Sequence, residues 1–278
     1  MQKQKTLART VEIAGIGLHS GAAVKLKINP GEVDSGIIFV RTDLESCPKI
    51  SATADKVTSV LRATTIEESG VKVFTIEHLM SALHISGIDN CVVELNAEEP
   101  PVLNGNSEDF YKKIKSVGTV EQENFRREVE IEKIYRVDGE GGKFLIALPY
   151  EGFRISFTSV NPHPAVGTQF ADFEITPEIY ESEIAPARTI AYEKEIEQLR
   201  QMGLGLGGTI ENVIVYNDEG WLNELKFADE FVRHKVLDLI GDLRLAGFVK
   251  GHFIAYNSGH ALNTKLAKKI FFDRKIES

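Results

Sequence analysis

The sequence predicts an α+β fold built from two similar domains, each a sheet with helices on one face. Three observations lead to this prediction. Each half of the chain contains two strand-like runs that are joined by a glycine-containing turn and ended by a proline, at Pro30 and Pro149. Later in each half, a helical pattern that carries a histidine precedes an alternating strand. The polar stretch 118–127 separates the halves, so we expect domains over residues 1–122 and 123–278.

The expected elements of the first half follow one another closely. Strands are predicted at residues 11–13 and 24–28, because apolar and charged residues alternate there. An apolar-periodic helix runs from Thr75, its expected N-cap, to Gly87, its expected stop. A strand is expected next, at residues 91–95.

The second half repeats this order, although the similarity between the halves is weak. Its expected elements are strands at residues 129–131 and 144–148, a helix at 229–243 and a strand at 253–256. One further helix is expected in each half, near residues 107–115 and 261–270.

An insert is expected in the C-terminal domain near residues 190–208. It combines an amphipathic helix, residues 192–202, with a run of alternating glycine and leucine at 203–208. The run lacks the Lys-Ser/Thr that follows a phosphate-binding loop. Two interpretations stay open: a flexible connection, or a small apolar flap that packs against a lipid-like ligand.

Composition restricts the class of protein. The 278 residues are 42% apolar and 26% charged, which is typical of a soluble globular protein. No apolar run is long enough to span a membrane, and the polar N-terminus lacks a signal sequence. The two cysteines, Cys47 and Cys91, suit the cytoplasm and are too few for a cysteine-based structural metal site. The net charge of −9 argues against a nucleic-acid partner.

His234 and Asp238 are the strongest sign of chemistry in the chain. They are four residues apart in a helical pattern, so their side chains lie on one face. Asp238 lies within an apolar run, where a carboxylate must be paired, hydrogen-bonded or bound to a metal. Two ligands from one helix and a third from elsewhere match an open, catalytic zinc site. For this pair alone, a hydrogen-bonded structural histidine is an equally good interpretation.

Glu77 and His78 favour the catalytic interpretation. They are adjacent in the first turn of the helix predicted at 75–87, where one can bind a metal and the other can stay unligated beside it. His260 follows a strand-like run, in a turn from which its side chain can reach inward. The remaining histidines have no such neighbours and are interpreted as structural or surface residues; they are His19, His84, His163 and His252.

Several segments together resemble the UDP-3-O-acyl-N-acetylglucosamine deacetylase family, the zinc amidases of bacterial lipid A synthesis. The resemblance extends from residue 15 to residue 266, and the segment around His234 is its most specific part. The segments are Thr75-Ile76-Glu77-His78-Leu79, Ala187-Arg188-Thr189, the glycine-leucine run 203–208, Arg233-His234-Lys235-Val236-Leu237-Asp238-Leu239-Ile240-Gly241-Asp242-Leu243, and Ser258-Gly259-His260-Ala261-Leu262-Asn263.

The resemblance implies a fold and an activity. The fold would be a duplicated α+β fold with two helices packed between two sheets. The activity would be zinc-dependent hydrolysis of the acetamide of UDP-3-O-acyl-N-acetylglucosamine, which releases acetate and UDP-3-O-acyl-glucosamine in the committed step of lipid A biosynthesis. We accordingly expect a cytoplasmic monomer that binds a UDP-sugar with a fatty acyl chain and makes transient contact with a membrane surface.

The resemblance also implies the roles of individual residues. One Zn²⁺ would be bound by His78, His234 and Asp238. Glu77 would be the general base, His260 its catalytic companion and Asp242 the residue that orients His260. Lys235 would contact the sugar-phosphate portion of the substrate, and Thr189 would hydrogen-bond the reacting carbonyl or its oxyanion.

The substrate-binding side departs from the family at two positions. Ile190 follows Thr189, and Asn161 lies in the segment 158–165; relatives often carry phenylalanine at these places. We expect these changes to affect ligand fit more than chemistry. A hydrophobic passage for the acyl chain is expected in the insert, lined by Ile196, Leu199, Leu204 and Leu206, although ordinary core packing is the competing interpretation for these residues.

Two other classes of function compete with this interpretation. A zinc peptidase or nucleobase deaminase is disfavoured, because neither His-Glu-x-x-His nor the deaminase zinc motif occurs in the sequence. A non-enzymatic protein that uses the metal as an interdomain staple is disfavoured as well, because structural zinc sites are usually closed by four protein ligands.

Overall fold

The computed structural model describes residues 2–277, so the expected domain ranges extend one residue further at each end, to Met1 and Ser278, outside the described residues. The chain forms two main sheets with helices between them, together with three smaller sheets, and this confirms the predicted α+β fold. The strands of the N-terminal half are β1 (Lys3–Leu7), β2 (Val11–Ile16), β3 (Ala23–Pro30), β4 (Ile37–Arg41), β5 (Lys49–Ser51), β6 (Val57–Ser59), β7 (Thr65–Glu68), β8 (Val71–Val73) and β9 (Cys91–Leu95). The remaining strands are β10 (Thr119–Phe125), β11 (Glu128–Glu130), β12 (Tyr135–Asp138), β13 (Phe144–Leu148), β14 (Phe153–Val160), β15 (Thr168–Glu174), β16 (Thr189–Tyr192), β17 (Val213–Asn217), β18 (Gly220–Trp221) and β19 (Phe248–Tyr256). The helices are α1 (Glu77–Ile85), α2 (Glu108–Val117), α3 (Pro177–Ile179), α4 (Glu193–Gln201), α5 (Glu230–Leu243) and α6 (His260–Glu277), with short helical turns at Ala54–Lys56, Glu140–Gly142, Tyr180–Ile184 and Arg244–Ala246.

The two main sheets have the same topology. The N-terminal sheet has the order β2-β3-β9-β4-β5, and the C-terminal sheet has the order β12-β13-β19-β14-β15. Within these two strand orders the parallel pair lies at the same place, β9 with β4 and β19 with β14. The C-terminal sheet has a sixth strand, β11, which also pairs in parallel with β19. The chain is therefore a structural duplication, as the order of its sequence patterns predicted.

One detail of the predicted repeat is wrong. Residues 129–131 were expected to form a hairpin with 144–148, but β11 pairs in parallel with β19, and the hairpin partner of β13 is β12. An alternating pattern identifies a strand and the face it buries, but it does not identify the strand's partner. The expected boundary at residue 122 falls inside β10, which pairs with β1; the division into two domains stays a prediction.

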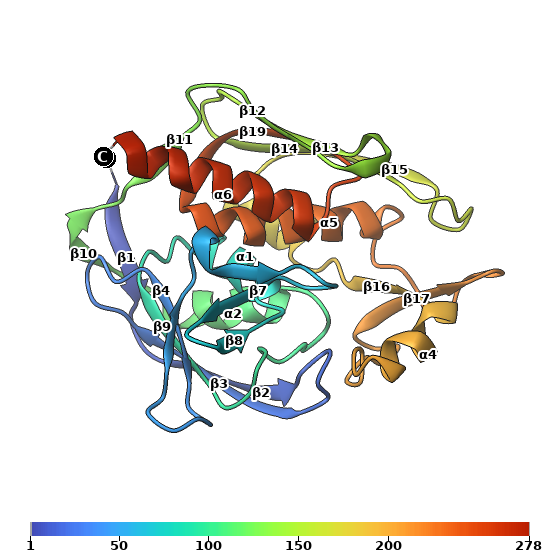
Figure 1. Ribbon diagram of the computed structural model, residues 1–278, viewed down its shortest axis with the longest axis horizontal. Helices are drawn as coiled ribbons and strands as arrows, with labels where there is room; N and C mark the ends of the chain where they lie inside the picture. Colours follow the sequence, from blue (N-terminus) through green and yellow to red (C-terminus); the bar gives the residue numbers. More distant parts are fainter. Residues whose placement is uncertain (1, 278) are drawn as a thin grey trace.

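The helices α1, α5 and α6 form the layer between the sheets (Figure 1). Helix α1 packs against α5, α5 packs against α6, and both α5 and α6 contact strands of the C-terminal sheet. Residues 77–84 of α1 and 236–243 of α5 are all buried, because each helix is covered by protein on every side. This position explains why charged residues in these two helices stand among apolar neighbours.

The start of α1 differs from the prediction. The N-cap is Ile76, without a side-chain cap, whereas Thr75 has a left-handed backbone with φ of 54° and its hydroxyl donates to Glu99 Oε2 at 3.0 Å. The expected stop is at its predicted place, because Gly87 follows the end of α1 with φ of 67°.

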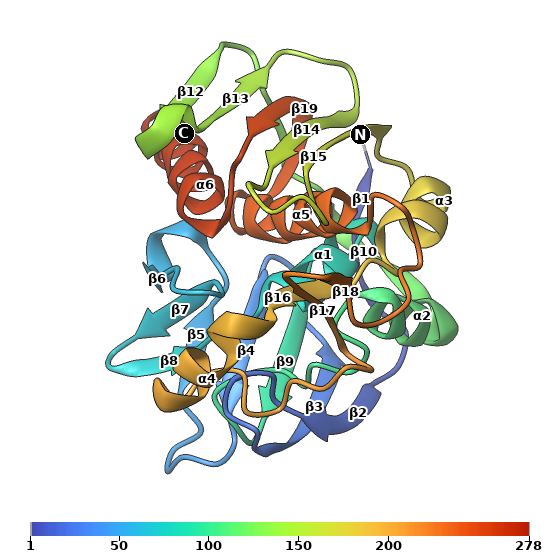
Figure 2. The ribbon, with the colours of Figure 1, turned by 90° about the vertical axis from the view of Figure 1, so that its right-hand side faces the viewer.

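Two small additions extend from this framework (Figure 2). One is the three-stranded sheet β6-β7-β8 of the N-terminal half; the other is the three-stranded sheet β16-β17-β18 with α4 beside it. Both approach the buried carboxylates and histidines of α1 and α5, as described below. None of the helices within residues 2–277 combines the length and the apolar character needed to cross a bilayer.

Candidate active site

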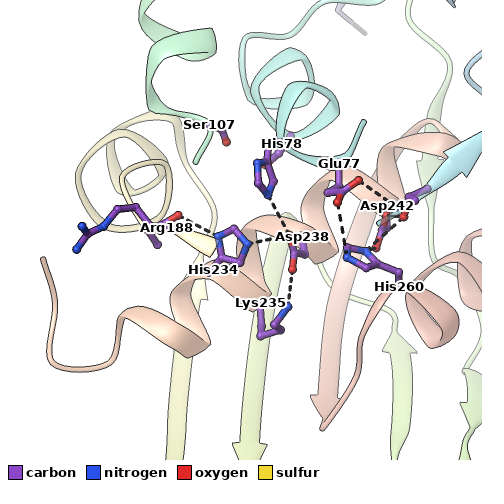
Figure 3. A network of polar contacts seen from close by, with 12 residues as sticks. Glu77, His78, Ser107, Arg188, His234, Lys235, Asp238, Asp242 and His260 are labelled. Carbon is purple, nitrogen blue, oxygen red and sulfur yellow. Dashed lines mark hydrogen bonds and ion pairs between the residues drawn. The ribbon is translucent and has the colours of Figure 1, made fainter. Parts of the chain in front are cut away.

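The site forms where α1 crosses α5 (Figure 3). Gly241 makes this crossing close, because a Cβ atom at this position would come within 2.0 Å of the carbonyl oxygen of Glu77. The first turn of α1 therefore lies directly against the last turns of α5. This contact brings Glu77 and His78 next to three polar residues of the facing helix, His234, Asp238 and Asp242.

His78, His234 and Asp238 converge on one point. Nε2 of His78 lies 3.6 Å from Asp238 Oδ1, and Nε2 of His234 lies 3.4 Å from the same oxygen. Their three ligand atoms all lie within 4.8 Å of one another, and all three residues are buried. Within residues 2–274, whose side chains the structure describes, no other cluster of three or more His, Cys, Asp or Glu side chains has this spacing. The set can hold a metal ion.

Asp238 fits a metal ligand in its hydrogen bonding. Its Oδ1 atom is buried and has no hydrogen-bond partner, whereas Oδ2 accepts from Lys235 Nζ at 2.7 Å. Burial opposes ionisation of this carboxyl, but His234 and the Lys235 ammonium hold the pKa of Asp238 well below its usual value. An ionised, buried oxygen without a partner is costly unless a cation completes the site.

His234 is held in the tautomer that a metal requires. Its Nδ1 donates to the carbonyl of Ala187 at 3.0 Å, so the proton resides on Nδ1 and the Nε2 lone pair faces Asp238. Burial lowers the pKa of His234 to about 3 despite the nearby Asp238 carboxylate, which keeps the imidazole neutral. The Ala187 carbonyl is in turn fixed by the next residue, because Arg188 Nε donates to the buried Glu230 at 2.9 Å.

Glu77, His260 and Asp242 form a second group beside the first. Nε2 of His260 lies 3.7 Å from Glu77 Oε1, and Nδ1 of His260 donates to Asp242 Oδ2 at 2.9 Å. Burial would lower the pKa of His260, but the carboxylates of Asp242 and Glu77 outweigh it and raise the pKa to about 10. Burial raises the pKa of Glu77, against the opposing effect of His260 and His78. The imidazole is therefore a cation at neutral pH, between two carboxyl groups.

Two residues without a predicted role, Thr64 and Asn263, complete this group. Thr64 Oγ1 donates to Asp242 Oδ1 at 2.5 Å, and Asn263 Nδ2 donates to Asp242 Oδ2 at 2.9 Å. Asn263 belongs to the segment after His260 but had no predicted role. Thr64 lies 178 positions from Asp242 in the chain, in a segment without a recognisable motif.

A cavity of about 590 Å³ opens beside both groups. Its wall includes Thr189 and Lys235, and it also includes the two family departures, Ile190 and Asn161. The wall also includes Glu77, His260 and the three candidate metal ligands, whereas Asp242 does not line it. Most of the catalytic residues expected from the sequence therefore meet around one space.

The insert supplies apolar side chains to the cavity, though fewer than expected. Ile196 and Leu199 of α4 line the wall, but Leu204 and Leu206 are not part of it. Leu206 is 52% exposed, and its Cβ atom lies next to Gly21.

His19, interpreted from the sequence as a structural or surface residue, has a place in the cavity wall that was not predicted. It is buried and lines the cavity; its Nδ1 accepts from the Gly205 amide at 3.3 Å, and its Nε2 has no hydrogen-bond partner. The wall of the same cavity includes Arg62 and Glu195, which form an ion pair between the two small additions. Arg62 Nη2 lies 2.8 Å from Glu195 Oε2 of α4.

Comparison with known proteins places this geometry in a family. The family model for LpxC, UDP-3-O-acyl N-acetylglycosamine deacetylase, matches residues 4–272. Three proteins named UDP-3-O-acyl-N-acetylglucosamine deacetylase are similar along almost their whole length. The chain is 44% identical to the protein from Marinobacter nauticus, over 97% of this chain and 90% of that relative. It is 42% identical to the protein from Hahella chejuensis, over 97% and 91%, and 40% identical to the protein from Xanthomonas campestris pv. campestris, over 99% and 92%.

Proposed function

The chain belongs to the UDP-3-O-acyl N-acetylglycosamine deacetylase family, and we propose that it hydrolyses the acetamide of UDP-3-O-acyl-N-acetylglucosamine at a zinc ion held between α1 and α5. It is an amide hydrolase of lipid A biosynthesis, and its products are acetate and UDP-3-O-acyl-glucosamine. The observation that carries the zinc proposal is the buried oxygen of Asp238, which has no hydrogen-bond partner and faces the Nε2 atoms of two histidines.

His78, His234 and Asp238 would hold the ion. Two neutral imidazoles and one carboxylate leave a net positive charge and an open coordination position, as in catalytic rather than structural zinc sites. When bound, Zn²⁺ lowers the pKa of a water molecule to roughly 7 and polarises a carbonyl group. Among the described residues no fourth ligand joins the three, which disfavours a structural staple.

Glu77 would act as the general base. Its Oε1 lies 3.7 Å from His260 Nε2, and burial of the carboxyl raises its pKa above the usual value, which makes the carboxylate a stronger base. It would take one proton from the attacking water as the water oxygen bonds to the acetamide carbon.

His260 would complete the reaction. Its imidazolium, stabilised by Asp242, would stabilise the developing oxyanion together with the Thr189 hydroxyl. As the carbon–nitrogen bond breaks, the leaving amine gains a proton from His260 or from protonated Glu77, and acetate is released. Lys235 would contact both Asp238 and the sugar-phosphate portion of the substrate.

The cavity fits the rest of the substrate. Ile196 and Leu199 would contact the acyl chain, and Ile190 and Asn161 would form the side that meets the nucleoside or the start of the chain. The proposal includes a cytoplasmic monomer, in keeping with two cysteines that are free thiols, and transient membrane contact through the exposed side chains Met202 and Leu206 of the flap.

The test is turnover of a series of UDP-3-O-acyl-N-acetylglucosamines with increasing chain length, followed by the appearance of free amine. The proposal expects amine and acetate in equal amounts and a rise in kcat/KM with chain length. Absence of amine release by zinc-loaded protein on every member of the series would contradict it.

A further inference from the structure

Thr64 touches both carboxylates of the reactive group. It immediately precedes β7 in the small sheet β6-β7-β8, and its side chain is completely buried, with 0% exposure. Its hydroxyl donates to Asp242 Oδ1 at 2.5 Å, and its backbone N–H donates to Glu77 Oε2 at 3.1 Å. This one residue, next to the sheet β6-β7-β8, therefore contacts the two carboxylates, Glu77 and Asp242, that lie on opposite sides of His260.

The hydroxyl of Thr64 fixes the rotation of Asp242. A carboxylate only accepts hydrogen bonds, so Thr64 is the donor. The other oxygen, Oδ2, accepts from His260 Nδ1 at 2.9 Å and from Asn263 Nδ2 at 2.9 Å. Asp242 is thus bonded on both oxygens, with Oδ2 turned toward the imidazole. Without the hydroxyl, Oδ1 would be a buried carboxylate oxygen with no partner, and the group could relieve this cost by rotating away from His260.

The amide of Thr64 has a matching effect on Glu77. The Thr64 N–H donates to Oε2 of Glu77, and the other carboxylate oxygen, Oε1, lies 3.7 Å from His260 Nε2. The oxygen that points toward the histidine is the one left free of Thr64. The distance between the two carboxylates is consequently set through the backbone and side chain of a single residue.

The small sheet β6-β7-β8 is bonded to the helix that carries His260. Lys268 of α6 donates from Nζ to the carbonyl of Val57 at 2.8 Å, and beside the sheet Lys56 Nζ lies 2.5 Å from Glu68 Oε1. Because α6 begins at His260, the first of these contacts joins the start of the small sheet to the helix that carries the imidazole. The contact helps to hold the small sheet beside the reactive group.

We propose that Thr64 is a positioning residue of the deacetylation reaction, and that the sheet β6-β7-β8 serves to bring it between Glu77 and Asp242. The inference rests on the proposed function, which gives Glu77 and His260 their roles. Thr64 does not contact the substrate in this account. It acts by keeping the carboxylates of Glu77 and Asp242 turned toward the two ring nitrogens of His260.

The experiment compares Thr64→Val, which keeps the shape and the amide but loses the hydroxyl, with Thr64→Ser, which keeps the hydroxyl. Thr64→Val should lower kcat by about 10-fold to 100-fold, the scale seen when a residue that orients a reactive group is lost, with KM and zinc per chain unchanged. Thr64→Ser should restore kcat. Adding Thr64→Val to Asp242→Ala should cause a smaller loss than Thr64→Val causes in wild type, because the hydroxyl acts mainly through that carboxylate; Oγ1 also lies 3.3 Å from His260 Nδ1.

A second readout does not depend on turnover. The Nδ1 proton of His260, hydrogen-bonded to Asp242, should give a low-field proton NMR signal that Thr64→Ser keeps, Thr64→Val shifts and His260→Ala abolishes. Should Thr64→Val fail to fold, Thr64→Ala replaces it in both comparisons.

A value of kcat for Thr64→Val within twofold of wild type, or equal losses in the Val and Ser variants, would overturn the inference. If wild-type protein releases no amine, the proposed function fails, and the NMR comparison alone then decides whether Thr64 orients the pair.

Discussion

Asp238 Oδ1 lies 3.4 Å from His234 Nε2, and it is buried without a hydrogen-bond partner. The neighbouring Lys235 satisfies only the other oxygen of the carboxylate, at 2.7 Å. Because Nδ1 of His234 donates to Ala187, a lone pair and an anionic oxygen face each other across a gap that a cation can fill. The predictions below depend on this arrangement and on the group of Glu77, His260 and Asp242 beside it.

Replacing Glu77 by alanine should separate chemistry from metal binding. Glu77 is not one of the three converging ligands, so the variant should keep its zinc. It should lose activity by about 10²-fold to 10⁴-fold, the usual scale for loss of a general acid or base. Zinc per chain and amine release, measured on the same sample, check this. Loss of zinc together with activity would instead make Glu77 a ligand.

The dependence of the reaction rate on pH should reveal the loss of the proton from the His260 imidazolium. Its pKa is raised to about 10, so the imidazolium is present at neutral pH and is lost as the pH rises through that value. A reaction that needs the imidazolium should therefore decline on the alkaline side. Asp242→Asn removes a charge that raises the pKa, so its alkaline decline should begin at lower pH. His260→Ala should flatten this limb while retaining zinc; a profile identical to wild type would reject the role of His260.

Hydrolysis of long-acyl substrates should be sensitive to substitution of Ile196 and insensitive to substitution of Leu206. Ile196 lines the cavity, whereas Leu206 lies in the same insert, outside the cavity wall and half exposed. A charge in an apolar wall forfeits about 0.8 kcal/mol for each methylene that it excludes from burial. Ile196→Asp should lower kcat/KM by at least about 10-fold for long-acyl substrates and spare a short-acyl analogue.

Leu206→Asp is the matched control and should affect both substrates little. Equal losses of Ile196→Asp on long and short chains, with a lower melting temperature, would show that Ile196 is ordinary core instead.

Ile190 should influence substrate fit more than chemistry. It follows Thr189 on β16 and lines the cavity, and isoleucine is smaller and less planar than the phenylalanine that the family resemblance led us to expect there. Ile190→Phe should therefore change KM more than kcat in steady-state assays with the nucleotide substrate. A larger change in kcat would place residue 190 against the reacting carbonyl.

The two candidate metal ligands of α5 could be predicted from the sequence, because helical spacing depends only on residues near one another in the chain. His234 and Asp238 had to share a face, and Asp238 had to have a partner in its apolar run. That α1 would lie against α5 came from family resemblance and not from periodicity. The contact itself depends on Gly241, whose missing side chain admits the Glu77 carbonyl.

Other features could not be predicted, for identifiable physical reasons. Thr64 acts through a single hydroxyl on a residue 178 positions away, and no local pattern encodes such a contact. The leucines of the flap alternate with Gly203 and Gly205, which have positive φ of 73° and 69° and turn the chain. Composition alone does not reveal which side chains then face the cavity. His19 was missed because its place in the cavity wall depends on the flap that packs beside it.

The most direct test of the central claim is zinc content and amine release measured together on wild type, Asp238→Ala and a triple replacement of His78, His234 and Asp238 by alanine. Wild type should contain one zinc ion per chain and release amine. Asp238→Ala should lose metal and activity together while its circular dichroism spectrum stays that of the folded protein. Asp242→Asn, a change to another buried carboxylate of α5, should keep its zinc and serves as the control. Full zinc occupancy in the triple replacement would contradict the account.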